Sequence, residues 1–498
     1  MIGRAARLLV ASLLFAASTA VAASSPPSTL VLEGATIYDG TGQTIKNGTV
    51  VVAGDRITYV GPHRPATLPP TAKFVSLHGK FLIPGLIDAH VHFGQTGFFE
   101  ARPDYVDLGS RFPYPQVLAY QRRHPVRYYP AYLGHGITAV YDVGGAPWTL
   151  ELPLAAEPDP NAPRIAAVGP MLTPAPDAAI ARFNAPFEKI MVNLDDDAAA
   201  TELVRYSLAW GAAGIKLWGI PQDDALTRMR VTVNQIKQAG SWALAHATTL
   251  VEAKAALKLG AAVLVHSVED QPVDDEFLAL ARREQVIYIP TLSVHRAIHD
   301  AKQALLGKAL AVEDPCGLLD ATTRGVLDDA ANLADDPTRA RLAAESEDDE
   351  RQLAALELRM ADNLRRVHAA GIAIAVGTDA GNPGQLHGFS LITELEAMQR
   401  TGIDPHDLLT MATVNGALAM HRSVDLGTIA EGKLADLVVL SQNPATDISH
   451  VRAVNRVMKG GQWIGGIGVN NATSLNLEVL RCHSRSTVIP SPRTHRKC

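Results

Sequence analysis

A regular alternation of short apolar runs and helix-like segments fills the middle of the chain and limits the folds open to it. Eight runs have the length and composition of buried strands, and they end at residues 92, 143, 169, 219, 247, 267, 291 and 380. Segments between them, such as Thr249 to Leu259, carry Ala and Leu at helical spacing. Strands that alternate with helices pair in parallel, and eight such units close a (β/α)8 barrel of the TIM type. An open doubly wound sheet is the alternative, but it would need a Gly-rich phosphate turn after an early strand, and the sequence has none.

Two β-rich pieces flank this region at opposite ends of the chain. Residues 29–62 contain short β-branched runs separated by Gly, Asn and Asp, and residues 425–444 and 454–464 have the same texture. Such runs are typical of a small β-sheet domain. We therefore predict an α/β protein in which residues 24–82 and 423–465 form one composite β-sandwich and residues 83–422 form the barrel.

The first 23 residues have the features of a signal peptide. Arg4 and Arg7 precede an apolar run from Leu8 to Ala17, and small residues follow up to Ala23. A retained membrane anchor is the alternative, but the run is shorter than the roughly 20 residues that a spanning helix needs. We expect cleavage near residue 22 or 23, with export to the periplasm or the medium and no membrane attachment afterwards.

The end of the chain and the cysteines add little constraint. Residues 466–498 have weak periodicity, which favours a disordered tail, with a strand at LNLEVL as the alternative. Export usually permits disulfides, but only Cys316, Cys482 and Cys498 are present and none forms a diagnostic spacing. The fold is therefore expected to hold without disulfides.

The charge balance argues against a nucleic-acid partner. The 498 residues carry a formal net charge of −6 and show no dense Lys/Arg face, whereas a nucleic-acid surface needs clustered cations. We expect a small-molecule partner, and a homo-oligomer is compatible with the sequence.

Polar side chains lie at or close to the C-terminal ends of the predicted strands, which is the face where barrels of this type form active sites. A single histidine at a strand end is usually a hydrogen-bonded structural residue. Several such residues around one opening are not explained in this way, because burying each polar group without a partner costs kilocalories per mole. The candidate site residues are His90, His92, Lys216, His246, His266 and Asp379.

The spacing of His90 and His92 in PGLIDAHVHFG suits metal binding. Residues i and i+2 of a strand point to the same face, with Cα atoms roughly 6.5–7 Å apart. Two imidazoles at that separation can reach one ion at about 2.0–2.1 Å. Nitrogen and carboxylate ligands without thiolates suit zinc or a similar divalent ion.

The chain resembles the metal-dependent amidohydrolase superfamily, specifically its imidazolonepropionase-like and prolidase-like (Xaa-dipeptidase) branch. The resemblance covers about Leu30 to Trp463 and runs in order through PGLIDAHVH, GITAVYDVGG, GIKLW, ALAHA, VHS, GTDAG and EGKLADLVVL. It implies two divalent ions, with zinc as the expected metal. The implied ligands are His90, His92 and Asp379 for one ion, His246 and His266 for the other, and Lys216 as a carboxylated lysine that bridges both.

The resemblance also implies a mechanism. Water that bridges two metal ions has its pKa lowered toward neutrality, and a metal ion polarises the scissile carbonyl. Asp379 is then expected to take the proton of the water and to pass it to the leaving nitrogen; the alternative is that Asp379 is a ligand only. Lys216 as an unmodified lysine is also an alternative, although an ammonium group among metal-facing histidines would repel the ions.

The substrate is less constrained by the sequence. The segment Phe93–Tyr132 holds ten of the 27 aromatic residues, and it forms either a roof over the site or a separate packing cluster. Relatives in this branch carry a Gly-Gly-His element after the third strand, which is absent here. His387 matches a histidine common after the eighth strand and either faces the substrate or makes a structural hydrogen bond. His135 and His295 match no motif.

The function that follows is a binuclear metal-dependent hydrolase that cleaves the amide bond of a dipeptide or an N-acyl amino acid. A hydrolase of cyclic amides, such as an imidazolone or a lactam, is the alternative within enzymes. A catalytically inactive binding protein on the same scaffold is the alternative from another class, but such a protein has no reason to retain all six ligands.

Overall fold

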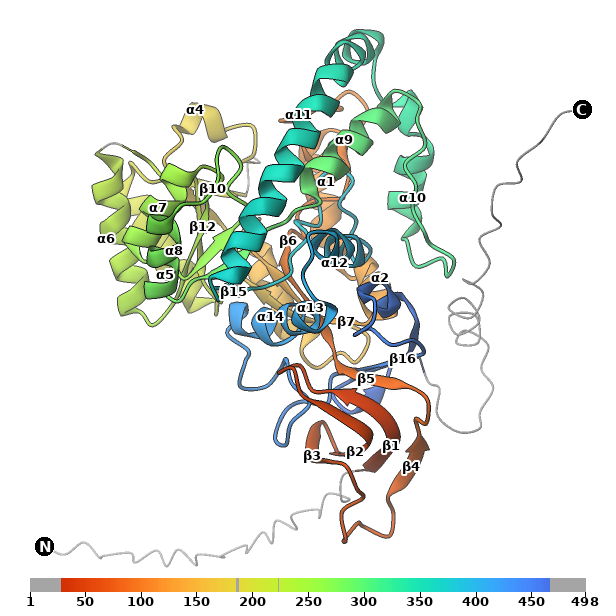
Figure 1. The fold of residues 1–498 in the computed structure, drawn as a ribbon. Helices are drawn as coiled ribbons and strands as arrows, with labels where there is room; N and C mark the ends of the chain where they lie inside the picture. Colours follow the sequence, from red (N-terminus) through yellow and green to blue (C-terminus); the bar gives the residue numbers. More distant parts are fainter. Residues whose placement is uncertain (1–27, 185–187, 223, 466–498) are drawn as a thin grey trace, which may run out of the picture.

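The computed structural model describes residues 28–184, 188–222 and 224–465 (Figure 1). The predicted signal peptide, the predicted tail, Cys482 and Cys498 lie outside these residues. Among the described helices none has the length and apolar character that a membrane crossing requires.

The two ends of the chain meet in one sheet of eight strands, seen at the lower end of Figure 1. Strand β5 (Phe81–Pro84) joins the two ends, because it pairs in parallel with β1 and antiparallel with β16. Its position also extends the small domain past the boundary expected at residue 82. The composite domain predicted from the two β-rich pieces is confirmed. Its other strands are β1 (Thr29–Tyr38), β2 (Thr44–Ala53), β3 (Arg56–Gly61), β4 (Lys73–Ser76), β16 (Leu437–Leu440), β17 (Val454–Lys459) and β18 (Gln462–Trp463).

The predicted barrel strands form two parallel sheets. One contains β6 (Leu86–Val91), β7 (Ile137–Asp142) and β8 (Arg164–Ala167). The other contains β11 (Ile215–Trp218), β12 (Ala243–His246), β13 (Val263–Val265), β14 (Ile287–Ile289) and β15 (Ala373–Ile374). A few backbone hydrogen bonds outside the paired strands join the edges: Ala213 N–H donates to the carbonyl of Ala167 at 2.9 Å, and on the other edge Ala89 N–H donates to that of Val376 at 2.9 Å and His92 N–H to that of Ala380 at 2.8 Å. The ring is thus completed by isolated hydrogen bonds and not by one continuous ladder, which is how the structure differs from the expected closed barrel.

Two short strands were not predicted. β9 (Met171–Thr173) and β10 (Met191–Asn193) pair with each other, and β9 also pairs with β11. The three-residue run of β9 is bounded by Pro170 and Pro174, so its local sequence reads as a loop. Its strand conformation depends on the neighbouring β11, which lies more than forty residues further along the chain.

The helices cover the outer face of the parallel sheets, and a longer insertion projects from the opposite end of the molecule from the small domain (Figure 1). In the insertion, α11 packs along α9, and Arg296 of α9 binds Glu350 and Glu357 of α11. The acidic run AESEDDE at residues 344–350 therefore contributes ion pairs to this contact. The helices named here are α5 (Asp197–Ala209), α6 (Ala225–Gln238), α7 (Leu250–Leu259), α8 (Asp275–Arg283), α9 (Val294–Leu305), α10 (Ala321–Asp328), α11 (Asp336–Ala369) and α12 (Ser390–Arg400).

A buried ion pair ties the small domain to the barrel. Arg164 of β8 donates from Nε and Nη2 to the two carboxylate oxygens of Asp436, which precedes β16, at 2.5 and 3.1 Å. Both residues are about 95% buried, with 4% and 5% exposure. A bidentate arginine–carboxylate pair of this kind fixes orientation as well as distance.

Candidate metal centre

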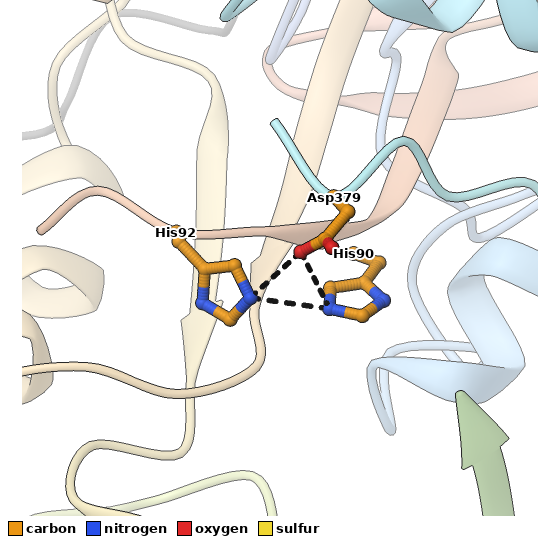
Figure 2. Close-up of side chains that lie close together, drawn as sticks. All are labelled: His90, His92 and Asp379. Carbon is orange, nitrogen blue, oxygen red and sulfur yellow. Dashed lines mark hydrogen bonds and ion pairs between the residues drawn. The ribbon is translucent and has the colours of Figure 1, made fainter. Parts of the chain in front are cut away.

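Three side chains converge at the C-terminal end of β6 and in the segment that follows β15 (Figure 2). The Nε2 atoms of His90 and His92 lie 3.2 Å apart. Oδ1 of Asp379 lies 3.2 Å from the first of these atoms and 2.9 Å from the second. Within the described part of the chain, this is the one group of three His, Cys, Asp or Glu residues whose ligand atoms all fall within 4.8 Å of one another.

The protonation of these groups fits a cation. His92 donates from Nδ1 to the carbonyl of Gly144 at 2.6 Å, which leaves Nε2 to face the other two side chains. Burial lowers the pKa of His90 well below its usual value. Burial opposes the ionisation of Asp379, but the positive charge that the neighbouring imidazoles carry when protonated outweighs it and holds the pKa of Asp379 well below its usual value; a cation bound between them acts in the same sense. Two imidazole lone pairs and a carboxylate oxygen repel one another in a buried site, and Oδ1 of Asp379 accepts no hydrogen bond from the described residues. A divalent metal ion would satisfy all three.

The other predicted ligands lie beside this group. His246 ends β12 and His266 follows β13; their ring centroids are 4.5 Å apart, and the ring of His266 lies 5.0 Å from that of His90. Burial lowers the pKa of His246 to about 3, so its ring is neutral at pH 7. The structure therefore brings all six candidate residues to one end of the parallel strands.

Lys216 of β11 is buried, with 1% exposure. Burial lowers its pKa to about 7, against the opposing effect of Asp379. The neutral amine is the nucleophilic form that combines with carbon dioxide, and here it is available near neutral pH. The environment of Lys216 thus favours the chemistry that carbamate formation needs.

Strained backbone marks the residues around the centre. His266, Thr291 and Asp379 have φ values of 75°, 47° and 61°, a region that non-glycine residues rarely adopt. Buried hydrogen bonds hold these conformations. Asp88 accepts from the N–H and the hydroxyl of Thr378, at 3.1 and 2.7 Å, and so fixes the residue before Asp379.

Asp142, at the end of β7, holds the other side of the centre. Its carboxylate accepts from the N–H of Phe93 at 2.9 Å and from the N–H of Gly144 at 3.2 Å. Since the carbonyl of Gly144 takes the Nδ1 hydrogen of His92, Asp142 orients both the chain after His92 and the partner of its ring.

A cavity of about 360 Å³ opens onto the metal-centre residues. Its floor includes His92, Lys216 and Asp379. One wall is apolar, and in it the rings of Phe183 and Trp218 meet edge to face at 6.0 Å. The remaining apolar side chains include Tyr105, Tyr114, Met171, Ile190, Val294 and Ile298.

Two ion pairs lie in the cavity wall, and sequence reasoning missed both. Arg102 donates from Nε and Nη2 to Asp104 at 2.9 and 2.7 Å, and its guanidinium lies 4.5 Å from the ring centroid of Tyr105. Nε2 of His295 lies 2.9 Å from Oε1 of Glu269. No motif marks these residues. Glu269 follows His266 by three positions, which is the one local signal that could have drawn attention to it.

The aromatic segment Phe93–Tyr132 serves both of the roles considered for it. Arg102, Tyr105 and Tyr114 reach the cavity. Its later aromatics instead enclose His387, whose ring lies 3.9 Å from that of Tyr128. His387 bonds the hydroxyl of Tyr132 at 2.7 Å and the carbonyl of Gln95 at 3.1 Å, so its hydrogen bonds are structural. His135 bonds the carbonyl of Ala131.

The fold and the convergent histidines and aspartate define a metal-site protein on a TIM-type scaffold. Residues 81–464 match the model of the amidohydrolase family, and the chain belongs to that family. The family membership expected from the sequence is confirmed.

Individual proteins similar to the chain come from more than one branch of the family. The chain is 36% identical to the ochratoxinase of Aspergillus niger over 107 residues, which is 20% of this chain and 21% of that protein. It is 36% identical to the imidazolonepropionase of Shouchella clausii over 112 residues, 21% of this chain and 25% of that protein. The matches thus span about a fifth to a quarter of these curated relatives. In three dimensions, a Xaa-Pro dipeptidase with bound methionine aligns at TM-score 0.65 and 21% identity, over 88% of this chain and 99% of the other.

Proposed function

We propose that the chain is a binuclear, zinc-dependent hydrolase that cleaves the amide bond of a dipeptide or an N-acyl amino acid. The observation that carries the proposal is the convergence of His90, His92 and Asp379 at the floor of a cavity, beside Lys216 and two further histidines. His90, His92 and Asp379 would hold one ion, His246 and His266 the other, and Lys216, once carboxylated, would bridge them. When bound, such ions lower the pKa of water and polarise a carbonyl.

The residues of this chain supply the proton transfer. Asp379 is ionised, so one oxygen of its carboxylate can hold an ion while the other takes a proton from the attacking water. The same carboxyl group can return the proton to the departing amide nitrogen, which then leaves as an amine. The strained φ of Asp379 and the hydrogen bonds of Asp88 to the preceding residue fix the carboxylate in place.

The cavity wall supports a substrate with a carboxylate. The guanidinium group of Arg102 uses two of its five N–H donors on Asp104, so that carboxylate does not occupy all of its donors. An arginine over an aromatic ring is well suited to bind a carboxylate. The apolar wall around Phe183 and Trp218 would take the side chain of the adjoining residue. Amide cleavage that releases an amino acid uses both features.

A substrate panel tests the proposal. Purified protein loaded with zinc should hydrolyse a member of a panel of dipeptides and N-acyl amino acids, with release of a free amino acid detected by its new primary amine. A parallel panel of lactams and imidazolones tests the cyclic-amide alternative. Turnover of the cyclic panel alone would reject the proposed substrate class, and absence of bound zinc after loading would reject the metal-dependent mechanism.

A further inference from the structure

A buried glutamate lies behind the metal centre and outside the predicted ligand set. Glu394 belongs to α12 and is fully buried. Its Oε1 accepts from the N–H of Leu292 at 2.7 Å, and its Oε2 accepts from the N–H and the hydroxyl of Ser293 at 2.8 and 2.7 Å. A buried carboxylate is costly unless donors satisfy it. Here all three donors come from one turn, the segment 290–293 that follows β14.

That turn is strained at its second residue. Thr291 has φ of 47°, which crowds a β-branched side chain against the backbone. The two N–H groups that follow Thr291 point together at the carboxylate of Glu394, and their hydrogen bonds offset the strain. Without that carboxylate, the N–H groups would be buried without acceptors, and Thr291 would be free to relax to an ordinary conformation.

The conformation of Thr291 sets the ring of His266. Nδ1 of His266 lies 2.9 Å from Oγ1 of Thr291, and both residues are buried. A neutral imidazole that donates from Nδ1 presents its lone pair on Nε2. The hydroxyl of Thr291 thus fixes the orientation of the His266 ring, and where it accepts from Nδ1 it leaves the Nε2 lone pair for a metal ion.

The same turn is tied to the loop that carries Asp379. Nε2 of Gln385 donates to the hydroxyl of Ser293 at 2.8 Å, while the carbonyl of Gln385 accepts from the N–H of Gly381 at 2.9 Å. The hydroxyl of Ser293 thus accepts a hydrogen bond from Gln385 and donates one to Glu394. The contacts of Glu394 reach both sides of the centre through a single turn.

We infer that Glu394 is a positioning residue for metal binding. It holds the 290–293 turn, and through Thr291 this turn holds His266 in the orientation that a metal ligand needs. This inference rests on the proposed metal centre. It assigns to α12 a role that no ligand motif indicates, since Glu394 follows His266 by more than a hundred residues.

The test measures zinc affinity, by competition with a chromophoric chelator, in full-length protein. Glu394→Gln and Thr291→Val should each weaken zinc binding by about 10- to 100-fold, the usual effect of removing a partner of a metal-ligating histidine. Thr291→Ser, which keeps the hydroxyl, should bind zinc like the unsubstituted protein. Because both changes act through one hydrogen bond, the double variant Glu394→Gln with Thr291→Val should bind zinc about as weakly as Thr291→Val alone.

A control on the same helix separates positioning from folding. Glu396 binds Arg452 at the surface of α12, and Glu396→Gln should leave zinc affinity unchanged. Normal affinity in Thr291→Val, or losses that multiply in the double variant, would overturn the inference while leaving the proposed function intact. If Glu394→Gln fails to fold, the comparison of Thr291→Val with Thr291→Ser still decides. An unsubstituted protein that binds no zinc would overturn the proposed function, and this inference with it.

Discussion

Oδ1 of Asp379 lies 2.9 Å from Nε2 of His92, across the interval between two strand ends that are nearly three hundred residues apart in the chain. The first prediction concerns this carboxylate. Asp379→Ala removes both a ligand oxygen and the proton acceptor, so we expect kcat to fall by about 10²- to 10⁴-fold. Steady-state kinetics at saturating zinc measures the loss. Asp362→Ala, at an exposed ion pair of α11, is the control and should retain full activity.

The second prediction concerns Lys216. With a pKa of about 7, its amine is mostly protonated at pH 6 and mostly neutral at pH 8. Since only the neutral amine combines with carbon dioxide, reconstitution of metal-free protein with zinc and bicarbonate should be faster at pH 8 than at pH 6. Stopped-time assays of recovered zinc content measure the rate. Equal rates at the two pH values, or full zinc binding by Lys216→Ala, would argue for an unmodified lysine.

The third prediction concerns recognition of the substrate carboxylate. Arg102→Met should lower kcat/KM for a carboxylate-bearing substrate by about 10- to 100-fold, because a hydrogen-bonded ion pair is lost from a partly buried wall. For the corresponding amide-capped substrate the same change should have little effect. Arg111→Met is the matched control, because Arg111 lies in the same segment, Phe93–Tyr132, but at a more exposed ion pair. Equal losses on both substrates would remove Arg102 from carboxylate binding.

The fourth prediction concerns the ion pair between the domains. Asp436→Ala leaves the buried guanidinium of Arg164 without its bidentate partner, so we expect the free energy of unfolding to fall by about 3–5 kcal/mol. Urea denaturation followed by circular dichroism measures the change. Replacement of both residues by apolar ones, as in Arg164→Met with Asp436→Leu, should recover much of the loss. A double variant as unstable as Asp436→Ala would show that the charge left behind is not the cause.

The fifth prediction concerns export. If residues 1–23 are a signal peptide, protein recovered from the periplasm or the medium should begin near residue 23 or 24, and N-terminal sequencing reads this directly. Deletion of residues 2–23 should retain the protein in the cytoplasm. An intact N-terminus on exported protein would instead favour the membrane anchor.

The local pattern of the sequence was sufficient for the scaffold and for the placement of the ligand candidates. The alternation of strands and helices is recorded in the spacing of neighbouring apolar residues. In a barrel of parallel strands, the C-terminal ends of all strands lie on the same face. His90, His92, Lys216, His246 and His266 could therefore be placed at one end of the parallel strands without coordinates. The strands β9 and β10 could not, because three residues are too few to show a periodicity and these gain strand conformation only from pairing with each other and with the distant β11.

The cavity wall and the support of the ligands were decided by tertiary structure alone. Arg102 reaches the cavity because the segment Phe93–Tyr132 folds over the strand ends, whereas the ring of Tyr128 in the same segment packs against His387. Glu394 meets the turn after Thr291 only because α12 lies against that turn in the folded chain. Such contacts join residues about a hundred or more positions apart, and their energy depends on burial and mutual geometry, which no local spacing records. The sequence by itself determined the scaffold and which residues face its active end; the packing of loops and helices around that end decided what the site can hold and how firmly.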